Sequence, residues 1–448
     1  MSAFFAAYAD RRVWLLIMLG FSSGLPYLLT QGTLTTWLRD VGLDLPTIGL
    51  VTLVGLFYSL KFLWAPLLDV YRLPFLGRRR GWMLSLQLAL VVSLLAMGLY
   101  GPSRTSLALA SGAMLFAVPP LFGLLAAPAL MATGYMDPET GPVVALAIVV
   151  AFLSSSQDVV IDAFRVDTLP ASERASGTAT FVIGYRLAMM LANAGALLIA
   201  EFTSWRIVYL VMAGSMSVGL VATLLADEPE GQEPPTSVRR ALLDALADLI
   251  VRAGGWRTLA LLGFVTLYRL GDNVAAKMLN PFLLDTGFSK PEIAYANKVV
   301  GALATVAGGL IGGGLVAKLG LMRSLLLFGL LQAGANVVYI VLDATGRDLV
   351  WLTVGVALDN LCGGLAMTAF AALLVGLCDR RFSATQYALL TAVAGVSGHL
   401  IGGASGYIAE AQGWSGFFLI SIAAFVPAVA LLLTLRGVVE SAEGPGRE

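Results

Sequence analysis

The stretch VVALAIVVAFLSSSQDVVIDAFRVD, residues 143–167, decides the fold. Its first eleven residues carry no charge, which is typical of a helix embedded in a membrane. Charges then follow, and Asp158, Asp162 and Arg165 share one helix face because residues three and four apart stack above one another. A charge near the bilayer centre costs at least a few kcal/mol, so such residues face a partner or a water-filled path. The stretch therefore predicts a membrane helix with a functional face.

The composition of the whole chain is that of an integral membrane protein. Hydrophobic residues make up 58% of its 448 residues, charged residues make up 12%, and the mean hydropathy is +0.84. A soluble domain carries about 25% charged residues. The formal net charge of zero gives no indication of nucleic-acid binding. Cys362 and Cys378 are too far apart for a metal or redox motif, so we expect two free thiols, no metal and no cofactor.

Apolar runs between polar breaks predict an all-α membrane protein with two bundles of six helices. We expect the first bundle in residues 1–226, a cytoplasmic linker with an amphipathic helix in 227–257, the second bundle in 258–436, and a disordered tail in 437–448. The predicted spans are 13–38, 46–69, 82–100, 142–167, 174–201, 205–226, 258–284, 291–316, 321–342, 348–377, 383–409 and 414–436.

An internal repeat supports this division into halves. The string IAEFTSW at residues 199–205 is echoed by IAEAQGW at residues 408–414. Repeated bundles of six spans are the organisation of transporters that alternate access around a central site.

The distribution of arginines predicts the topology. Arginine-rich loops alternate along the chain, and the positive-inside rule places both termini and the linker in the cytoplasm. The region 82–167 lies between two such loops, so it must cross the membrane an even number of times. Two spans already supply that number. We therefore expect the extra apolar run around 105–132 to be a re-entrant or periplasmic helical hairpin.

Polar and charged residues inside the spans indicate an anionic substrate. Each charge could belong to a structural ion pair, but buried pairs stabilise poorly compared with apolar packing. The cations also exceed what the carboxylates need, and an arginine grips a carboxylate through two hydrogen bonds. The candidate substrate-binding residues are Tyr27, Gln31, Tyr58, Lys61, Tyr185, Arg186, Arg269, Lys277 and Lys298.

The membrane carboxylates suggest proton coupling. Burial disfavours the charged form of an aspartate and a neighbouring arginine favours it, so a site that alternates between the two environments can load and release a proton. The candidates are Asp158 and Asp162, followed by Asp272 and Asp359.

The loop between the second and third spans suggests a gate. Asp69 ends the second span, and the string GRRRGW at residues 77–82 opens the third. This acid followed by a glycine–arginine cluster resembles the loop signature of the major facilitator superfamily. The resemblance implies a latch, made by Asp69, Arg78 and Arg79, on the cytoplasmic side of the outward-facing state. Membrane anchoring by basic residues is the alternative. Arg165 and Asp167 lie near the same mouth and are further candidates for gating.

Longer strings in both halves resemble the AmpG-type muropeptide permeases of that superfamily. They are GFSSGLP at 20–26, KFLWAP at 61–66, GRRRGW at 77–82, SQDVVIDA at 156–163, GYRL at 184–187, NLCGG at 360–364 and FSATQ at 382–386.

The resemblance implies a proton-coupled importer of cell-wall breakdown products in the bacterial inner membrane. The substrate would be the disaccharide of N-acetylglucosamine and anhydro-N-acetylmuramic acid, with or without peptide. Its carboxylates suit the cations, and Tyr27, Tyr58, Trp64, Tyr185 and Tyr268 are candidate walls of a large cavity. We expect a monomer without enzymatic activity. A carrier of another bulky anion, such as an acyl-coenzyme A or a siderophore, is the alternative. A membrane sensor or transferase is a more distant one, since no soluble catalytic domain is visible.

Overall fold

The computed structural model describes residues 10–30, 32–41, 51, 53–118, 140–170, 173–229, 237–400 and 405–443. Every regular element in these ranges is a helix, as the sequence predicts. Nine of the described helices are long and apolar enough to cross a membrane, or ten if one bent pair counts as a span. Of the twelve predicted spans, 13–38, 46–69 and 383–409 include residues outside the described ranges, and 258–284 is interrupted between residues 267 and 270.

The helices form two halves joined by one connecting helix. The first half contains α2 (Arg11–Leu29), α3 (Gly32–Asp40), α5 (Leu56–Leu60), α6 (Ala65–Val70), α7 (Arg78–Tyr100), α8 (Arg104–Ala117), α10 (Thr140–Thr168), α11 (Arg174–Met190), α12 (Ala196–Phe202), α13 (Trp205–Ser215) and α14 (Ser217–Leu225). The connecting helix is α15 (Val238–Ala253). The second half contains α16 (Gly255–Leu267), α17 (Leu270–Asp285), α18 (Lys290–Tyr295), α19 (Ala302–Leu319), α20 (Leu321–Ala335), α21 (Val337–Thr345), α22 (Leu349–Leu377), α23 (Ser383–Leu400), α24 (Ser405–Ala423), α25 (Val426–Thr434) and α26 (Arg436–Glu443).

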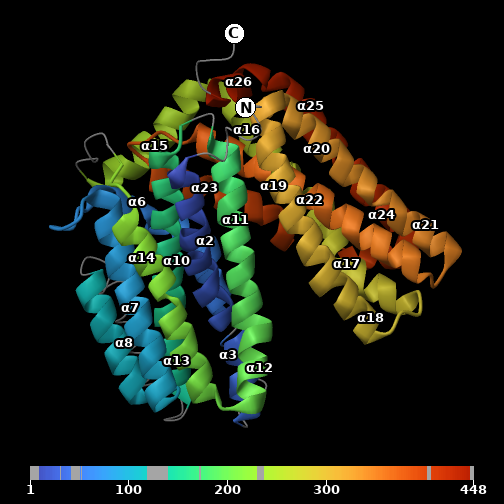
Figure 1. Cartoon of the computed structure of the whole chain (residues 1–448). Coiled ribbons are helices and arrows are strands. Elements are labelled where there is room, and N and C mark those ends of the chain that lie inside the picture. The colour runs from blue at the N-terminus through green and yellow to red at the C-terminus, as the bar shows by residue number, and fades with distance from the viewer. Residues whose placement is uncertain are drawn as a thin grey trace.

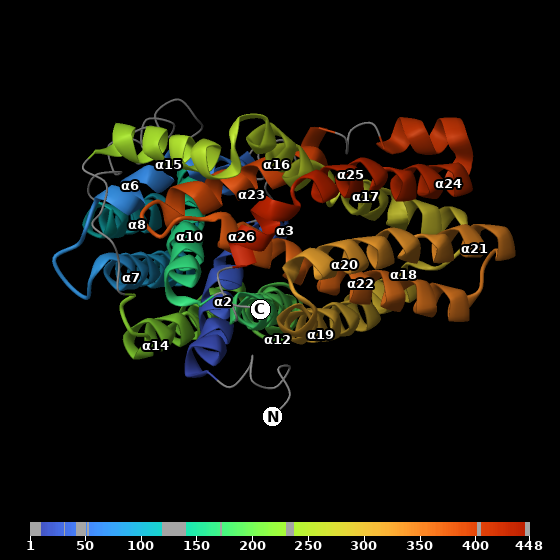
Figure 2. The same ribbon diagram turned by 90° about the horizontal axis from the view of Figure 1, so that it is seen from above.

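The two halves meet at one end of the molecule. Figure 1 shows them converging where both termini, α15 and α26 lie, and diverging toward the opposite end. Figure 2, the view from above, places the halves side by side, with α23 and α26 near their junction. We call the end with the termini the closed end and the opposite end the open end.

Glycines let the principal helices approach closely. A Cβ atom on Gly184 of α11 would overlap the backbone oxygen of Ile17 in α2, and one on Gly20 would overlap that of Phe181. The second half repeats the device, because Gly308 of α19 lies against the backbone of Leu361 in α22. Between membrane helices the attraction comes from close van der Waals packing and not from the hydrophobic effect, so such contacts set the geometry.

The connecting helix is amphipathic. Ser237 caps α15 by accepting a hydrogen bond from the backbone N–H of Arg240, 3.2 Å away. Its buried face is formed by Ala241, Ala245 and Leu249. Leu242, which the periodicity places on that face, is 38% exposed, so the buried stripe is narrower than the sequence suggests.

The prediction of a disordered tail in 437–448 is wrong for residues up to 443. These residues form α26, which buries Val438, Val439 and Ala442 on one face. Arg174 at the start of α11 donates a hydrogen bond of 2.5 Å to the carbonyl oxygen of Ala442. Apolar residues at helical spacing within the acidic segment therefore pack the last helix against α20 and α22 of the second half, and the Arg174 hydrogen bond ties it to the first half.

The apolar insertion around 105–132 begins as a helix. Ser103 and Ser106 form a capping box that starts α8, and α8 packs between α7 and α10. At 14 residues it is about 21 Å long, shorter than the bilayer core of about 30 Å. The rest of the insertion, 119–139, lies outside the described residues, so the predicted hairpin stays a prediction.

The glycine contacts give a stability prediction with a matched control. We expect Gly184→Ala to destabilise the protein by roughly 1–3 kcal/mol, because the added methyl group must push α2 and α11 apart. Gly214→Ala in α13 meets no atom within 4 Å and is expected to be neutral or slightly stabilising. Thermal inactivation in detergent, followed by size-exclusion chromatography, measures both. Equal midpoints for the two variants would contradict this account of the packing.

Candidate substrate cavity and gate

Asp69 joins the two halves at the closed end. It lies in α6 of the first half and is completely buried. Its Oδ2 atom accepts hydrogen bonds from the backbone N–H of Thr385, 2.8 Å away, and from the Thr385 hydroxyl, 2.7 Å away. Both groups belong to the first turn of α23 in the second half. A carboxylate at a helix N-terminus satisfies free N–H groups and interacts favourably with the helix dipole. Asp69 therefore caps a helix that its own half does not contain.

Arg79 extends this contact into a network. Its guanidinium binds Asp69 at 2.7 Å and Asp167 of α10 at 2.7 Å, and it donates to the Ser383 hydroxyl at 2.6 Å. Arg78 adds hydrogen bonds of 3.3 Å to Asp167 and 3.0 Å to the carbonyl oxygen of Arg380. The structure thus brings together the predicted gate residues Asp69, Arg78 and Arg79. Asp167 is the carboxylate that both arginines bind.

Two residues of the linker form hydrogen bonds with α7 and α23, the helices that contribute to the Asp69 network. Glu228, at the start of the linker, accepts hydrogen bonds from the backbone N–H groups of Arg79 and Arg80, at 2.8 and 2.9 Å, and so caps α7. On the other side, Gln386 of α23 donates a hydrogen bond of 2.8 Å to Asp248 of α15. Both ends of the connector therefore hold the elements that carry the gate.

A second layer of charge lies deeper in the first half. Lys61 pairs with Asp162 at 3.3 Å, and Arg165 pairs with the other oxygen of Asp162 at 3.0 Å. The Arg165 guanidinium also lies 4.3 Å from the centre of the Phe181 ring, a cation–π arrangement. Lys61 and Asp162 are thus each other's partners, which is the structural ion pair that the sequence left open. The substrate and proton roles predicted for them stay untested.

Asp158 lies beyond this layer and is only partly buried. It accepts a hydrogen bond from the Ser23 hydroxyl of α2. The rings of Tyr27 and Tyr58 meet edge to face near it, with centres 4.8 Å apart, and Tyr185 is partly buried on α11. The prediction that Trp64 and Tyr268 line the cavity is wrong. Trp64 is 3% exposed and donates to Ser156, and Tyr268 is 5% exposed and donates to the carbonyl oxygen of Leu325, so both belong to the core.

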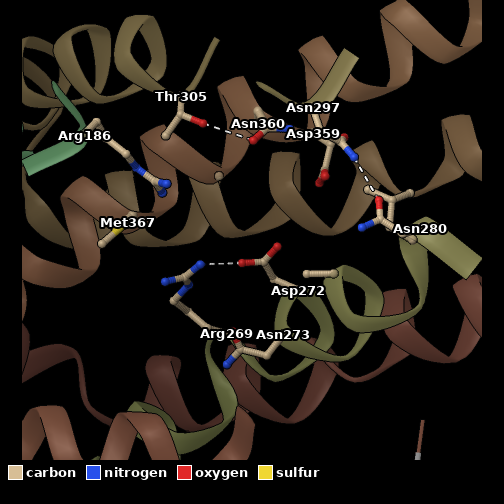
Figure 3. A pocket seen from close by; sticks show the side chains of 13 residues that line it. Arg186, Arg269, Asp272, Asn273, Asn280, Asn297, Thr305, Asp359, Asn360 and Met367 are labelled. Carbon is tan, nitrogen blue, oxygen red and sulfur yellow. Dashed lines mark hydrogen bonds and ion pairs between the residues drawn. The ribbon is translucent and has the colours of Figure 1, made fainter. Parts of the chain in front are cut away.

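A cavity of about 330 Å³ is lined by residues of both halves (Figure 3). Its lining joins Arg186, from α11 of the first half, to residues of the second half. These residues are Arg269, Asp272, Asn273, Ala276, Leu279, Asn280, Asn297, Thr305, Asp359, Asn360, Gly363 and Met367.

The carboxylates of the cavity share one amide. Arg269 pairs with Asp272 at 2.6 Å. The Nε2 atom of Gln332 in α20 donates to Oδ1 of Asp272 at 3.1 Å and to Oδ1 of Asp359 at 2.9 Å. Tyr339 of α21 donates to the second oxygen of Asp359 at 3.1 Å. Asp359 thus has two neutral hydrogen-bond donors and no ion pair among the described residues, whereas Asp272 has a cation.

Arg186 is the exception in this pattern of pairing. Its guanidinium points into the cavity, and it has neither a hydrogen bond nor an ion pair with any described residue. The cavity therefore offers one unpaired guanidinium and a second, that of Arg269, which is 31% exposed. Two guanidinium groups with free donors form a binding site for a carboxylate or another oxyanion.

Some predicted residues cannot be placed, and some cavity residues were missed. Gln31 and the side chains of Lys277 and Lys298 lie outside the described part of the structure. Gln332, Tyr339 and Asn297 were not among the residues predicted for the site. Gln332 carried a usable signal, because it is a polar residue in the apolar run of α20.

The fold and this site define the class of the protein. A family model described as the Major Facilitator Superfamily matches residues 16–402, and the chain belongs to that superfamily. It is accordingly a multi-pass membrane transporter and not an enzyme. The fucose:proton symporter of Escherichia coli has the same fold, with a TM-score of 0.64 over 97% of this chain and 99% of that one, at 11% identity.

Within the superfamily, the chain is similar to muropeptide permeases. It is 40% identical to the anhydromuropeptide permease of Escherichia coli K12, over 98% of this chain and 82% of that protein. It is 28% identical to a putative AmpG transporter of Rickettsia felis, over 96% of this chain and 97% of that protein. The resemblance read from the short strings is confirmed.

The gate predicts a measurable change in the exposure of a native thiol. Cys378 is 7% exposed and packs in one core cluster with Val166 and Ala175 of the first half. In a Cys362→Ser background, we expect Asp69→Asn to raise the rate of Cys378 alkylation about tenfold. The reason is that hydrogen bonds to a charged group contribute about 1.5–3 kcal/mol to the closed end.

The control for this experiment is the same change at the open end. Asp343→Asn removes a carboxylate that accepts hydrogen bonds from Ser415, and should leave the alkylation rate unchanged. An unaltered rate in Asp69→Asn would show that Asp69 does not hold the halves together.

Proposed function

We propose that the protein imports anhydromuropeptides across the bacterial inner membrane, together with protons, by alternating access. The observation that carries the proposal is the guanidinium of Arg186, which has no partner among the described residues and faces Arg269 across a cavity between the halves. The relative that is 40% identical is an anhydromuropeptide permease. The lactyl and peptide carboxylates of such a substrate match the two arginines in charge and geometry.

The compartment that each end faces follows from the topology that the arginines predict. With both termini in the cytoplasm, the closed end faces the cytoplasm and the open end faces the periplasm. The described conformation is then outward-facing, and the gate at Asp69 holds it. Release into the cytoplasm requires Asp69 to leave the N-terminus of α23 while the open end closes behind the substrate.

Competition for Arg269 offers a physical route to proton coupling. A substrate carboxylate that binds Arg186 and Arg269 weakens the hold of Arg269 on Asp272. The charges of Asp272 and Asp359, which meet at the amide of Gln332, are then poorly compensated, and one carboxylate gains stability by taking up a proton. Asp359 is our preferred carrier because it has no ion pair with any residue that the structure describes. Asp158 remains a second candidate, whereas Asp162 is held between Lys61 and Arg165.

Substrate transport gives the first test. Uptake of labelled N-acetylglucosaminyl-anhydro-N-acetylmuramic acid into proteoliposomes should require an inward proton gradient. We expect Arg186→Gln and Arg269→Gln each to lower initial uptake by roughly tenfold or more, because each removes a charged hydrogen-bond donor. Arg257→Gln, an exposed position on α16, is the control and should transport normally. Absent or gradient-insensitive uptake by the unaltered protein would refute the proposal.

Neutralising Asp359 separates coupling from binding. Asp359→Asn keeps a side chain that can accept hydrogen bonds from Gln332 and Tyr339 but cannot carry a proton. We expect gradient-driven accumulation to fall to the equilibrium level while exchange of external for internal substrate continues. Asp285→Asn, at the exposed end of α17, is the matched control. Gradient-driven accumulation that persists in Asp359→Asn would show that another carboxylate carries the proton.

A further inference from the structure

We propose that Asn336 stabilises the protonated form of Asp359, by accepting a hydrogen bond from the Tyr339 hydroxyl when that hydroxyl turns away from the carboxylate. Asn336 acts through Tyr339 and is a positioning residue, since it does not line the cavity. The assignment rests on the proposed function and adds to it the means by which the coupling site accommodates its proton.

Gln332, Asn336 and Tyr339 lie on one face of a single membrane helix. α20 and α21 together form an apolar helix of 25 residues, Leu321–Thr345, and Asn336 continues it with right-handed helical backbone angles. Spacings of four and three residues bring side chains to the same helix face. All three side chains are buried. Along the helix, Asn336 therefore lies between the two residues that donate hydrogen bonds to Asp359.

The side-chain oxygen of Asn336 is a buried acceptor without a donor. Asn336 is 2% exposed, and its Oδ1 atom has no hydrogen-bond partner among the described residues. A buried polar atom without a partner costs free energy, because it has given up its hydrogen bonds to water. Gln332 Oε1 also lacks a donor, but that amide cannot turn, since its Nε2 group is held by Asp272 and Asp359.

Asp359 has the hydrogen bonds of an ionised carboxylate. Its Oδ1 atom accepts from Gln332 Nε2, and its Oδ2 atom accepts from the Tyr339 hydroxyl. A proton on Oδ2 turns this atom into a donor, which then faces the O–H of Tyr339. A phenol hydroxyl can both donate and accept, so Tyr339 removes the conflict by turning its hydrogen away and accepting from Asp359.

The hydrogen of Tyr339 then needs a new acceptor, and Asn336 Oδ1 supplies it. In the protonated network, Asp359 donates to Tyr339, Tyr339 donates to Asn336, and Gln332 still donates to Asp359. This network has one more hydrogen and one more hydrogen bond than the described structure, and the new O–H of Asp359 is the only covalent bond formed. The acceptor without a partner in one protonation state is thus used in the other.

The proton reaches Asp359 from the cavity, which Asp359 lines and Asn336 and Tyr339 do not. The side chains of Lys277, Lys298 and His399 lie outside the described part of the structure. The variants compared below leave all surrounding charged and titratable groups other than Tyr339 unchanged. Among the described residues these groups are Arg269 and Asp272 at the start of α17, Arg186 on α11, Cys362 on α22, and Asp343 on α21, which binds Ser415.

The pH dependence of transport tests the role of Asn336. Initial uptake of labelled disaccharide into proteoliposomes is measured over a range of external pH, with the inward proton gradient held constant. Since the acceptor stabilises only the protonated form, Asn336→Leu should lower the pH of half-maximal uptake by about one unit, a tenfold loss of proton affinity, and keep the maximal rate at low pH. Asn336→Asp, which can only accept and adds a negative charge, should raise that pH.

A residue that only supports the fold would give a different result, a lower rate at every pH in both variants. Thr345→Val, at the exposed end of α21, is the control and should keep the unaltered pH profile. If size-exclusion chromatography shows that Asn336→Leu is not folded, Asn336→Ala takes its place. An unchanged pH profile in the folded variant would overturn the proposal.

A double-variant comparison tests whether Asn336 acts through Tyr339. In a Tyr339→Phe background the hydroxyl is absent, so Asn336→Leu should cause no further shift. An equal shift in both backgrounds would show that Asn336 binds water or another group instead. If Tyr339→Phe does not transport, proton uptake by the purified protein on addition of disaccharide gives the same comparison. Gradient-insensitive uptake by the unaltered protein would refute the proposed function, whereas gradient-driven uptake without the expected shifts would refute only this inference.

Discussion

A charge taken into the membrane interior must find a partner, and the network of Asp69, Arg79 and Asp167 meets this requirement at the closed end. Asp69 completes its hydrogen bonding only by capping α23, which belongs to the other half. The halves therefore come together where Asp69 can complete its hydrogen bonds, although Oδ1 of Asp167 has no hydrogen-bond partner among the described residues. The conformation with an accessible cavity depends on that contact.

Pairing becomes less complete from the closed end toward the cavity. At the closed end, the side chains of Asp69 and Arg79 each have several charged or polar partners. In the next layer, Asp162 forms ion pairs with both Lys61 and Arg165. In the cavity, Asp272 has a cation, Asp359 has only neutral donors, and Arg186 has no partner among the described residues. A charge without a partner in a polar cavity is available for a ligand. The gradient of pairing thus separates the residues that hold the conformation from those that can bind a substrate.

The two wrong predictions have the same origin. The tail was expected to be disordered because it is acidic, yet Val438, Val439 and Ala442 bury one face of α26. Trp64 and Tyr268 were expected to line the cavity because aromatic residues suit sugars, yet both pack in the core and hydrogen-bond there. In each case composition described the residue type correctly, but the neighbours in space decided its environment.

The sequence alone was sufficient to predict the class of fold, because this depends on hydropathy along single helices. The resemblance of one loop to a family signature singled out Asp69, Arg78 and Arg79, whose side chains the structure brings together with Asp167. The sequence also identified Arg186, Arg269, Asp272 and Asp359 as membrane charges. Only the tertiary structure decided which charges pair, because partners such as Gln332 come from helices far apart in the chain. The same holds for Arg186, which has no partner among the described residues, since hydrogen-bond satisfaction is a property of the assembled helices and not of any one segment.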